Sequence, residues 1–166
     1  MTINSIALAH VIWTFIVPLY PLFITSRSKL DIYFMVYILL LNLSWTLLNG
    51  ECFITLYSLA TTDTKIKVKR DPTNMVDFYQ VLPKELYDNF LFYILIGAQT
   101  AATWIVFSRN QDIIGLGWTF ALIVASLGYL YVLRTNSPNL MIVYTEAYKL
   151  ALVWVIAQGL EKMKRA

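Results

Sequence analysis

The chain has 166 residues, of which 58% are hydrophobic, 15% aromatic and only 14% charged. Soluble domains are roughly 45–50% apolar and about 25% charged, so this chain lacks the polar surface that a domain of its size needs in water. Thirteen Lys and Arg stand against ten Asp and Glu, a net charge too small and too scattered for a nucleic-acid-binding protein. The composition therefore indicates an integral membrane protein and excludes a disordered, a collagen-like or an ordinary soluble chain.

Uncharged runs of membrane-spanning length recur along the chain, and a spanning helix needs about 20 mainly apolar residues. The sequence therefore predicts an all-α fold, a multi-pass bundle of about five transmembrane helices, or four if the last segment is interfacial. Short connections between the runs predict antiparallel neighbours in a single transmembrane domain, residues 1–166. The expected spans are 1–26, 32–50, 89–108, 113–133 and 140–160.

The second run continues to Thr62 with Glu51 as its one charge. A helix from Ile32 to Thr62 would be ~46 Å long, which exceeds the ~30 Å thickness of the hydrocarbon layer. We therefore expect it either to project from the membrane or to break at Asn49-Gly50. If it is continuous, one polar stripe would run along it, made of Ser44, Glu51, Thr55, Ser58 and Thr62.

Residues 63–88 form the main expected extramembrane loop, between the second and third spans. The loop is basic at first, and its second half mixes aromatic and charged residues, as an amphipathic segment at a membrane interface does. Its clustered cations predict contact with anionic lipid headgroups or with a partner protein; they are Lys65, Lys67, Lys69 and Arg70.

Ionisable residues inside a membrane span are costly and are candidate functional residues by default. Glu146 and Lys149, three residues apart, are expected to form an ion pair that holds the bundle, the alternative being an ion path. Glu51 is either functional or solvated at the headgroup level, and His10 is either a hydrogen-bonded packing residue or a proton relay. The candidate intramembrane polar site comprises His10, Asn49, Glu51, Glu146 and Lys149.

Small residues recur at four-residue spacing in two of the expected spans. Gly97 with Ala101 and Ala98 with Ala102 form two such pairs, and Gly117, Ala121 and Ala125 form a longer series. Because small residues let membrane helices approach closely, they predict helix contacts within the bundle; the alternative is the seam of a homo-oligomer.

The stretch WTLLNGECFITLY, Trp45 to Tyr57, resembles the end of the second helix in an uncharacterised family of small bacterial membrane proteins, where an aromatic residue precedes a C-P-L-T box. Cys52, Ile54 and Thr55 match the box, and Phe53 stands in place of its proline. The acidic residue that follows the box is missing before Asp63. The resemblance covers about a dozen residues and implies a shared membrane bundle with no activity attached.

No soluble-type enzyme is expected, because the chain has one histidine, one cysteine, no G-x-S-x-G or H-E-x-x-H motif and no phosphate-binding glycine loop. A disulfide and a cysteine-based zinc site are excluded by the single cysteine, and no metal or cofactor is predicted. Three functional classes stay open: a structural, assembly or partner-binding membrane protein, a small channel or proton-coupled transporter using intramembrane carboxylates, and a protein that binds or modifies lipid or sterol. The expected partners are the lipid bilayer, other membrane proteins or a second copy of the chain.

Overall fold

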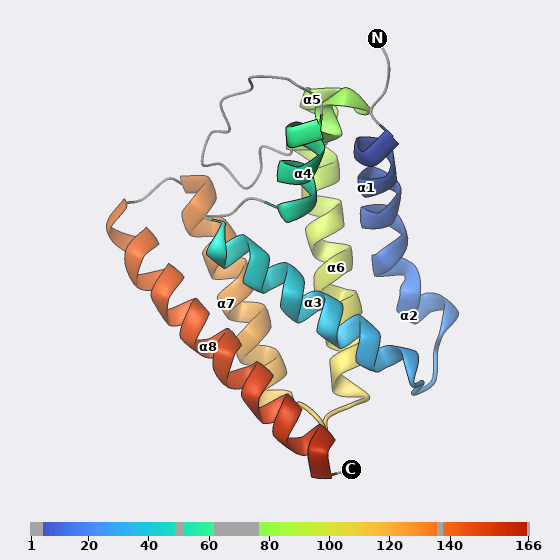
Figure 1. Cartoon of the computed structure of the whole chain (residues 1–166), viewed down its shortest axis with the longest axis vertical. Coiled ribbons are helices and arrows are strands. Elements are labelled where there is room, and N and C mark those ends of the chain that lie inside the picture. Colours follow the sequence, from blue (N-terminus) through green and yellow to red (C-terminus); the bar gives the residue numbers. More distant parts are fainter. Residues whose placement is uncertain (1–4, 49–51, 62–76, 136–137, 166) are drawn as a thin grey trace.

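The computed structural model of the chain describes residues 5–48, 52–61, 77–135 and 138–165, which form a bundle of helices (Figure 1). The predicted all-α fold is confirmed, because the described elements are all helical. Two of the short elements, η1 and η2, are 3₁₀ turns, and η3 is a π-helical turn. In chain order the elements are α1 (Ser5–Ile16), η1 (Val17–Leu19), α2 (Tyr20–Phe23), α3 (Leu30–Leu47), α4 (Phe53–Thr61), η2 (Phe78–Gln80), α5 (Lys84–Leu86), η3 (Tyr87–Leu91), α6 (Phe92–Ser108), α7 (Leu116–Thr135) and α8 (Pro138–Arg165).

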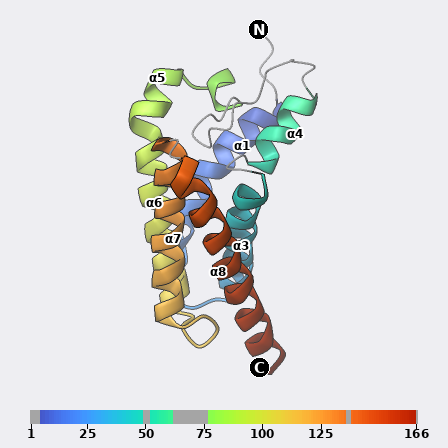
Figure 2. The ribbon, with the colours of Figure 1, turned by 90° about the vertical axis from the view of Figure 1, so that its left-hand side faces the viewer.

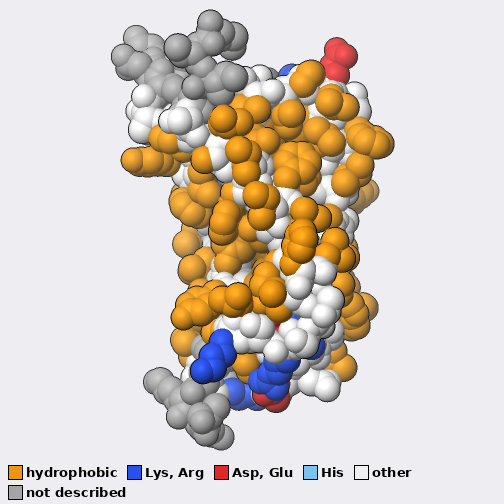
Figure 3. Space-filling view, turned by 90° about the vertical axis from the view of Figure 1, so that its right-hand side faces the viewer, with side chains coloured by type: hydrophobic (Ala, Val, Ile, Leu, Met, Phe, Trp, Pro, Cys, Tyr) orange, Lys and Arg blue, Asp and Glu red, His pale blue; other side chains and the backbone are white. Residues whose placement is uncertain are grey.

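Four helical stretches in the described part of the chain are long and apolar enough to cross a membrane: Ser5–Phe23, Leu30–Leu47, Lys84–Ser108 and Leu116–Thr135. Only 28–39% of the residues in their most apolar windows are buried within the protein, so most of their side chains face outward. Figure 3 shows hydrophobic side chains over the middle of one face, with charged side chains gathered at the lower end. An apolar belt of this extent suits lipid rather than water, and the chain is a membrane protein by this criterion.

The last helix, α8, is 28 residues long and carries Glu146 and Lys149 within its apolar part. It nevertheless runs beside α7 for most of the length of the bundle (Figures 1 and 2). It also packs against α3. The last segment is therefore the fifth member of the bundle rather than a separate segment on its surface.

The second apolar run forms two helices. Of the two predicted arrangements, the break near Asn49-Gly50 is confirmed, and one continuous helix from Ile32 to Thr62 is wrong. Helix α3 ends at Leu47, and α4 begins at Phe53 and lies beside α1 (Figure 1). The two ends flank the Asn49-Gly50 pair that was expected to break the helix. The predicted polar stripe therefore does not exist as one face, because its described members are divided between α3 and α4.

The first span changes its helical geometry at its two prolines. Pro18 stands at the start of η1 and Pro21 at the start of α2. Proline has no backbone N–H to donate and is tolerated in the first turn of a helix, so each proline begins a new short element and the span continues to Phe23.

The buried residues form two clusters. The larger one lies mainly between α3, α6, α7 and α8. The smaller one lies between α1 and the segment from η2 to α6, and it includes Val11, Phe78 and Tyr87. Phe78 and Tyr87 belong to the segment predicted to lie at the membrane interface, yet they are 0% and 2% exposed. The segment is buried because its aromatic side chains, among them Phe78 and Tyr87, pack against α1.

The small residues singled out in the sequence are divided between the outside of the bundle and its core: Ala102 is 1% exposed and Ala125 packs against the larger buried cluster, whereas most of the others face outward. A Cβ built on Gly97 or Gly117 would have no neighbouring atom within 4 Å, and Ala101 and Ala121 are exposed as well. The close approach occurs instead between α7 and α8, where a Cβ on Gly128 would lie 3.0 Å from Cε1 of Tyr144. The prediction of close packing is thus wrong for the two outward-facing pairs.

Asp31 and Arg109 form an ion pair at one end of the bundle. The pair joins the loop between α2 and α3 to the loop between α6 and α7. The carboxylate of Asp31, 0% exposed, accepts hydrogen bonds from Nε of Arg109 at 2.8 Å, Nδ2 of Asn110 at 2.7 Å and the hydroxyl of Tyr20 at 2.6 Å. Arg109 also donates to the carbonyl of Ile24. Charges that the sequence places in two short loops therefore form one buried cluster.

A second ion pair connects the same loops on the surface. Nη2 of Arg27 lies 2.7 Å from Oδ2 of Asp112, and both side chains are more than half exposed. The guanidinium of Arg27 lowers the pKa of Asp112 below its usual value. Exposed pairs of this kind contribute little to stability because water and salt screen them.

The substitution Asp31→Asn is expected to destabilise the folded protein by about 3–5 kcal/mol, because it leaves the Arg109 guanidinium buried without its counter-charge. Asp112→Asn, which removes the exposed partner of Arg27, is the matched control and is expected to cost about 0–1 kcal/mol. Unfolding of both variants in detergent micelles, followed by circular dichroism, measures the difference. Equal losses in the two variants would contradict the structural role of the Asp31 cluster.

Gly128→Leu is expected to destabilise the bundle by about 1–3 kcal/mol, because the added side chain meets the Tyr144 ring and separates α7 from α8. Gly97→Leu introduces the same side chain on an open helix face and is expected to be neutral or to gain up to about 1 kcal/mol from helix propensity. The thermal unfolding midpoint should therefore fall in Gly128→Leu and stay unchanged or rise in Gly97→Leu.

Candidate functional site

Three buried polar side chains meet near the end of the bundle that is opposite to the Asp31 cluster. His10 comes from α1, Cys52 immediately precedes α4, and Asp77 immediately precedes η2. Nδ1 of His10 lies 2.6 Å from Oδ2 of Asp77, and Nε2 lies 3.6 Å from Sγ of Cys52. The exposed fractions of His10, Cys52 and Asp77 are 5%, 3% and 0%. Residues 42 and 67 positions away from His10 in sequence are thus brought against one imidazole ring.

The two ring nitrogens of His10 face different partners. When the Asp77 carboxylate accepts a hydrogen bond from Nδ1–H, Nε2 is the nitrogen that faces the thiol of Cys52. The arrangement is that of a nucleophile, a base and a group that orients the base.

Two further contacts hold the set in place. The hydroxyl of Thr55 donates to Oδ1 of Asp77 at 2.9 Å, so both carboxylate oxygens of Asp77 have a partner. The ring of Phe78 meets the His10 ring edge-on, with centroids 5.1 Å apart and an interplanar angle of 89°. The imidazole is therefore fixed by a hydrogen bond from one side and by an aromatic contact from another.

Cys52 is held by the helix that follows it. The backbone N–H of Leu56 donates to the carbonyl of Cys52 at 3.1 Å, which places Cys52 at the N-terminal boundary of α4. Thr55, which binds Asp77, lies in the first turn of the same helix. Because α3 ends before Cys52 and α4 lies beside α1, the thiol of Cys52 lies against His10.

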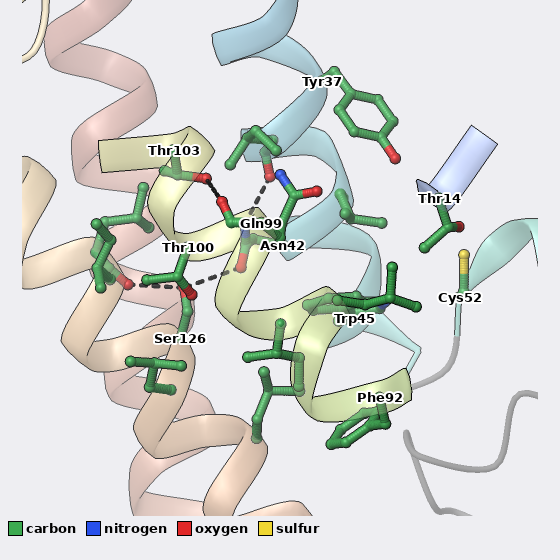
Figure 4. Close-up of a pocket in the computed structure, with 18 of the residues that line it drawn as sticks. Thr14, Tyr37, Asn42, Trp45, Cys52, Phe92, Gln99, Thr100, Thr103 and Ser126 are labelled. Carbon is green, nitrogen blue, oxygen red and sulfur yellow. Dashed lines mark hydrogen bonds between the residues drawn. The ribbon is translucent and has the colours of Figure 1, made fainter. Parts of the chain in front are cut away.

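A pocket of about 100 Å³ lies next to this cluster, inside the bundle between α1, α3, α6 and α7. Figure 4 shows Cys52 at one side of it and Ser126 at the other, with Gln99 between them. Twelve of the lining residues are aliphatic or aromatic: Tyr37, Ile38, Leu41, Trp45, Tyr87, Phe92, Leu95, Ile96, Leu122, Ile123, Leu127 and Leu130. The others, apart from Cys52, are His10, Thr14, Asn42, Gln99, Thr100, Thr103 and Ser126.

The polar lining residues differ in how well their hydrogen bonds are satisfied. Oδ1 of Asn42 accepts from Ser126 at 3.0 Å and from the hydroxyl of Tyr148, so it joins α3, α7 and α8. Nε2 of Gln99 is buried and has no partner in the described part of the structure. A buried donor without a partner costs roughly 1–3 kcal/mol, so Gln99 offers a hydrogen bond to a molecule in the pocket.

The residues predicted from sequence are not gathered in one place. His10 belongs to the cluster just described, whereas Glu146 and Lys149 lie on α8 and do not line the pocket. Lys149 Nζ is 2.9 Å from Oε1 of Glu146, and their side chains are 32% and 63% exposed, so the expected ion pair is present but on the outer surface of the bundle. Asn49, Glu51, Lys65, Lys67, Lys69 and Arg70 lie outside the described residues.

Sequence reasoning did not identify Cys52, Thr55 and Asp77 as members of a site. One signal was available, because an up-and-down arrangement brings the start of the first span and the end of the second to the same side of the membrane. That arrangement places the only His and the only Cys of the chain on one side. Nothing local in the sequence marks Asp77, whose role depends on the packing of Phe78 against α1.

No group of three or more His, Cys, Asp or Glu side chains in the described ranges is arranged to hold a metal ion. Comparison with known proteins gives no match to a family model, to a curated protein or to a solved structure. The resemblance of Trp45–Tyr57 to a bacterial membrane family stays a prediction.

Thr55→Val is expected to destabilise the protein by about 1.5–3 kcal/mol, because it removes a hydrogen bond to the buried Asp77 carboxylate. Thr61→Val is the control on the same helix, since the exposed Thr61 hydroxyl only donates back to the carbonyl of Ser58, and its effect should stay within about 0.5 kcal/mol. Chemical unfolding in detergent measures both. Indistinguishable midpoints would show that the Thr55–Asp77 bond contributes nothing.

Proposed function

We propose that this membrane protein binds a lipid molecule, with a segment of its acyl chain held in the pocket between α1, α3, α6 and α7. The observation that carries the proposal is the pocket itself, a space of about 100 Å³ at the level of the apolar belt with a mainly aliphatic and aromatic lining. An engineered cavity of about 150 Å³ with an apolar lining takes up benzene, so a space of this size accepts several methylene groups.

The polar groups of the pocket support a ligand that is not purely apolar. Ligand sites are commonly apolar with a few placed polar groups that fix the orientation of the ligand. Here Gln99 supplies an unused donor in the middle of the pocket, and His10 and Cys52 lie at one side. A lipid with a carbonyl or carboxyl group near one end of its chain matches this distribution.

The remaining functional classes find less support. An ion or proton path through Glu146 and Lys149 would require these groups to face the interior, and both lie on the outer side of α8. A purely structural role leaves the pocket and the unpaired Gln99 amide without an explanation. A role in assembly with other membrane proteins is compatible with lipid binding and is not favoured by any particular contact.

Photo-crosslinking in detergent micelles tests the proposal, using palmitic acid that carries a diazirine in its chain as the probe. The wild-type protein is expected to form adducts on pocket residues, and an excess of oleic acid should suppress them. Thr100→Phe fills the pocket and should abolish the competed adducts. Ala101→Phe adds a phenyl ring at the next position, on the exposed side of α6, and should retain them.

Two results would contradict lipid binding at this site. One is crosslinking that oleic acid does not compete, which is the behaviour of probe dissolved in the micelle around the protein. The other is equal competed crosslinking of Thr100→Phe and Ala101→Phe, which would place the bound chain elsewhere.

A further inference from the structure

We infer that Cys52 is a nucleophile that accepts an acyl group from a long-chain acyl thioester, with His10 as its base and Asp77 as the residue that positions His10. The inference rests on the proposed function, since the pocket would hold the chain of the acyl donor. It gives the protein an acyl-transfer activity that binding alone does not require.

The contacts of Cys52 are those that thiol chemistry needs. Sγ lies 3.6 Å from Nε2 of His10, a hydrogen-bond distance for sulfur, and Nδ1 of the same ring is held at 2.6 Å by Asp77. Nucleophiles of this type are activated by an adjacent base that a third group orients.

The position of the thiol relative to the pocket selects the substrate class. Cys52 and His10 both line the pocket, which extends from Cys52 to Ser126 (Figure 4). An acyl chain lying along it would therefore have one end beside the thiol. A long-chain acyl group is the electrophile that combines an apolar chain with a reactive terminal carbonyl.

The start of α4 provides electrostatic support for the reaction. The first N–H groups of a helix have no carbonyl partner within the helix, and the helix dipole favours negative charge at this end. Helix α4 has nine residues, and its first N–H belongs to Phe53, the neighbour of Cys52. These donors follow Cys52 directly in the chain and would stabilise an oxyanion that forms when the thiol attacks a carbonyl.

The reaction balances without any additional oxidant or metal. Nε2 of His10 takes the proton from Sγ as the thiol attacks the carbonyl carbon of the acyl thioester. The tetrahedral intermediate then collapses, the bond to the leaving thiolate breaks, and His10 returns the proton to that thiolate. The products of this first step are an acyl thioester on Cys52 and a free thiol. In the second step Nε2 of His10 takes the proton of water or of an alcohol as its oxygen attacks the thioester carbonyl. The bond between the acyl carbon and Sγ breaks, and His10 returns the proton to Sγ, which releases an acid or an ester and the free Cys52 thiol.

Burial of the site is expected to slow hydrolysis of the acyl thioester on Cys52. Cys52 and His10 are 3% and 5% exposed, so bulk water reaches the thioester poorly, and exclusion of water suppresses hydrolysis of reactive intermediates. A transfer to a membrane-dissolved alcohol is thereby favoured over simple hydrolysis.

The test is acylation of the purified protein in detergent micelles by palmitoyl-coenzyme A that carries a terminal alkyne. The wild-type chain is expected to incorporate the alkyne, and neutral hydroxylamine, which cleaves thioesters, should release it. The matched control is the double variant Cys52→Ala, Thr61→Cys, which places the only cysteine on the exposed face of α4. It should react at least about 100-fold more slowly, the usual contribution of a positioned base.

A second variant tests the base itself. His10→Gln retains a side chain that can donate to Asp77, and it should slow acylation of Cys52 by about 100-fold or more while keeping a cooperative thermal transition. If His10→Gln fails to fold, the comparison of wild type with the double variant still decides the matter. Equal rates in that comparison, or a folded His10→Gln variant with the wild-type rate, would overturn the inference.

The outcomes separate this inference from the proposed lipid site. Competed crosslinking in the pocket without acylation of Cys52 would overturn the acyl transfer and leave lipid binding in place. Acylation of Cys52 that is equally fast in Thr100→Phe would support the thiol chemistry and overturn the pocket as the site of the chain. Slow acylation in Thr100→Phe, with Ala101→Phe unchanged, supports both.

Discussion

Lipid supplies no hydrogen-bond partner, so each polar group that this bundle buries has to find a partner within the protein. The structure meets this constraint with three polar clusters at different levels. Asp31 and Arg109 lie at one end, Asn42, Ser126 and Tyr148 in the middle, and the His10 cluster near the other end. Each cluster joins elements that are distant in sequence. Since apolar contacts give little directional preference between helices in lipid, these clusters determine which helices meet and in what register.

The three clusters differ in how fully their polar groups are hydrogen-bonded within the protein. The oxygens of Asp31 are fully engaged by a guanidinium, an amide and a hydroxyl. The His10 cluster includes a thiol that lines the pocket, where the buried Nε2 of Gln99 has no hydrogen-bond partner among the residues that the structure describes. A cluster that is satisfied on all sides stabilises the fold. The His10 cluster ends instead in a thiol that lines a mainly apolar pocket.

Much of the fold could be predicted from the sequence, because the uncharged runs are direct consequences of the lipid environment. The spans, the short antiparallel connections and the break near Asn49-Gly50 all follow from lengths and charges. The site could not be predicted in the same way. Its members come from three segments, and only the folding back of α4 and the burial of Phe78 bring them together. The sequence also places Asp31 and Arg109 in short loops, where charged side chains are expected to face water, whereas in the structure they pair with each other and are 0% and 13% exposed.

The cluster in the middle of the bundle has a consequence for synthesis in the cell. The hydroxyls that donate to Asn42 lie 84 and 106 residues further along the chain, in α7 and α8, which are translated after α3. When α3 first enters the membrane, its Asn42 side chain can bond only to its own helix, as it does to the carbonyl of Ile38. The hydroxyls of α7 and α8 supply these donors only after both helices have been translated. Until then, α3 is expected to stay near the insertion machinery, where its polar side chain is not surrounded by lipid.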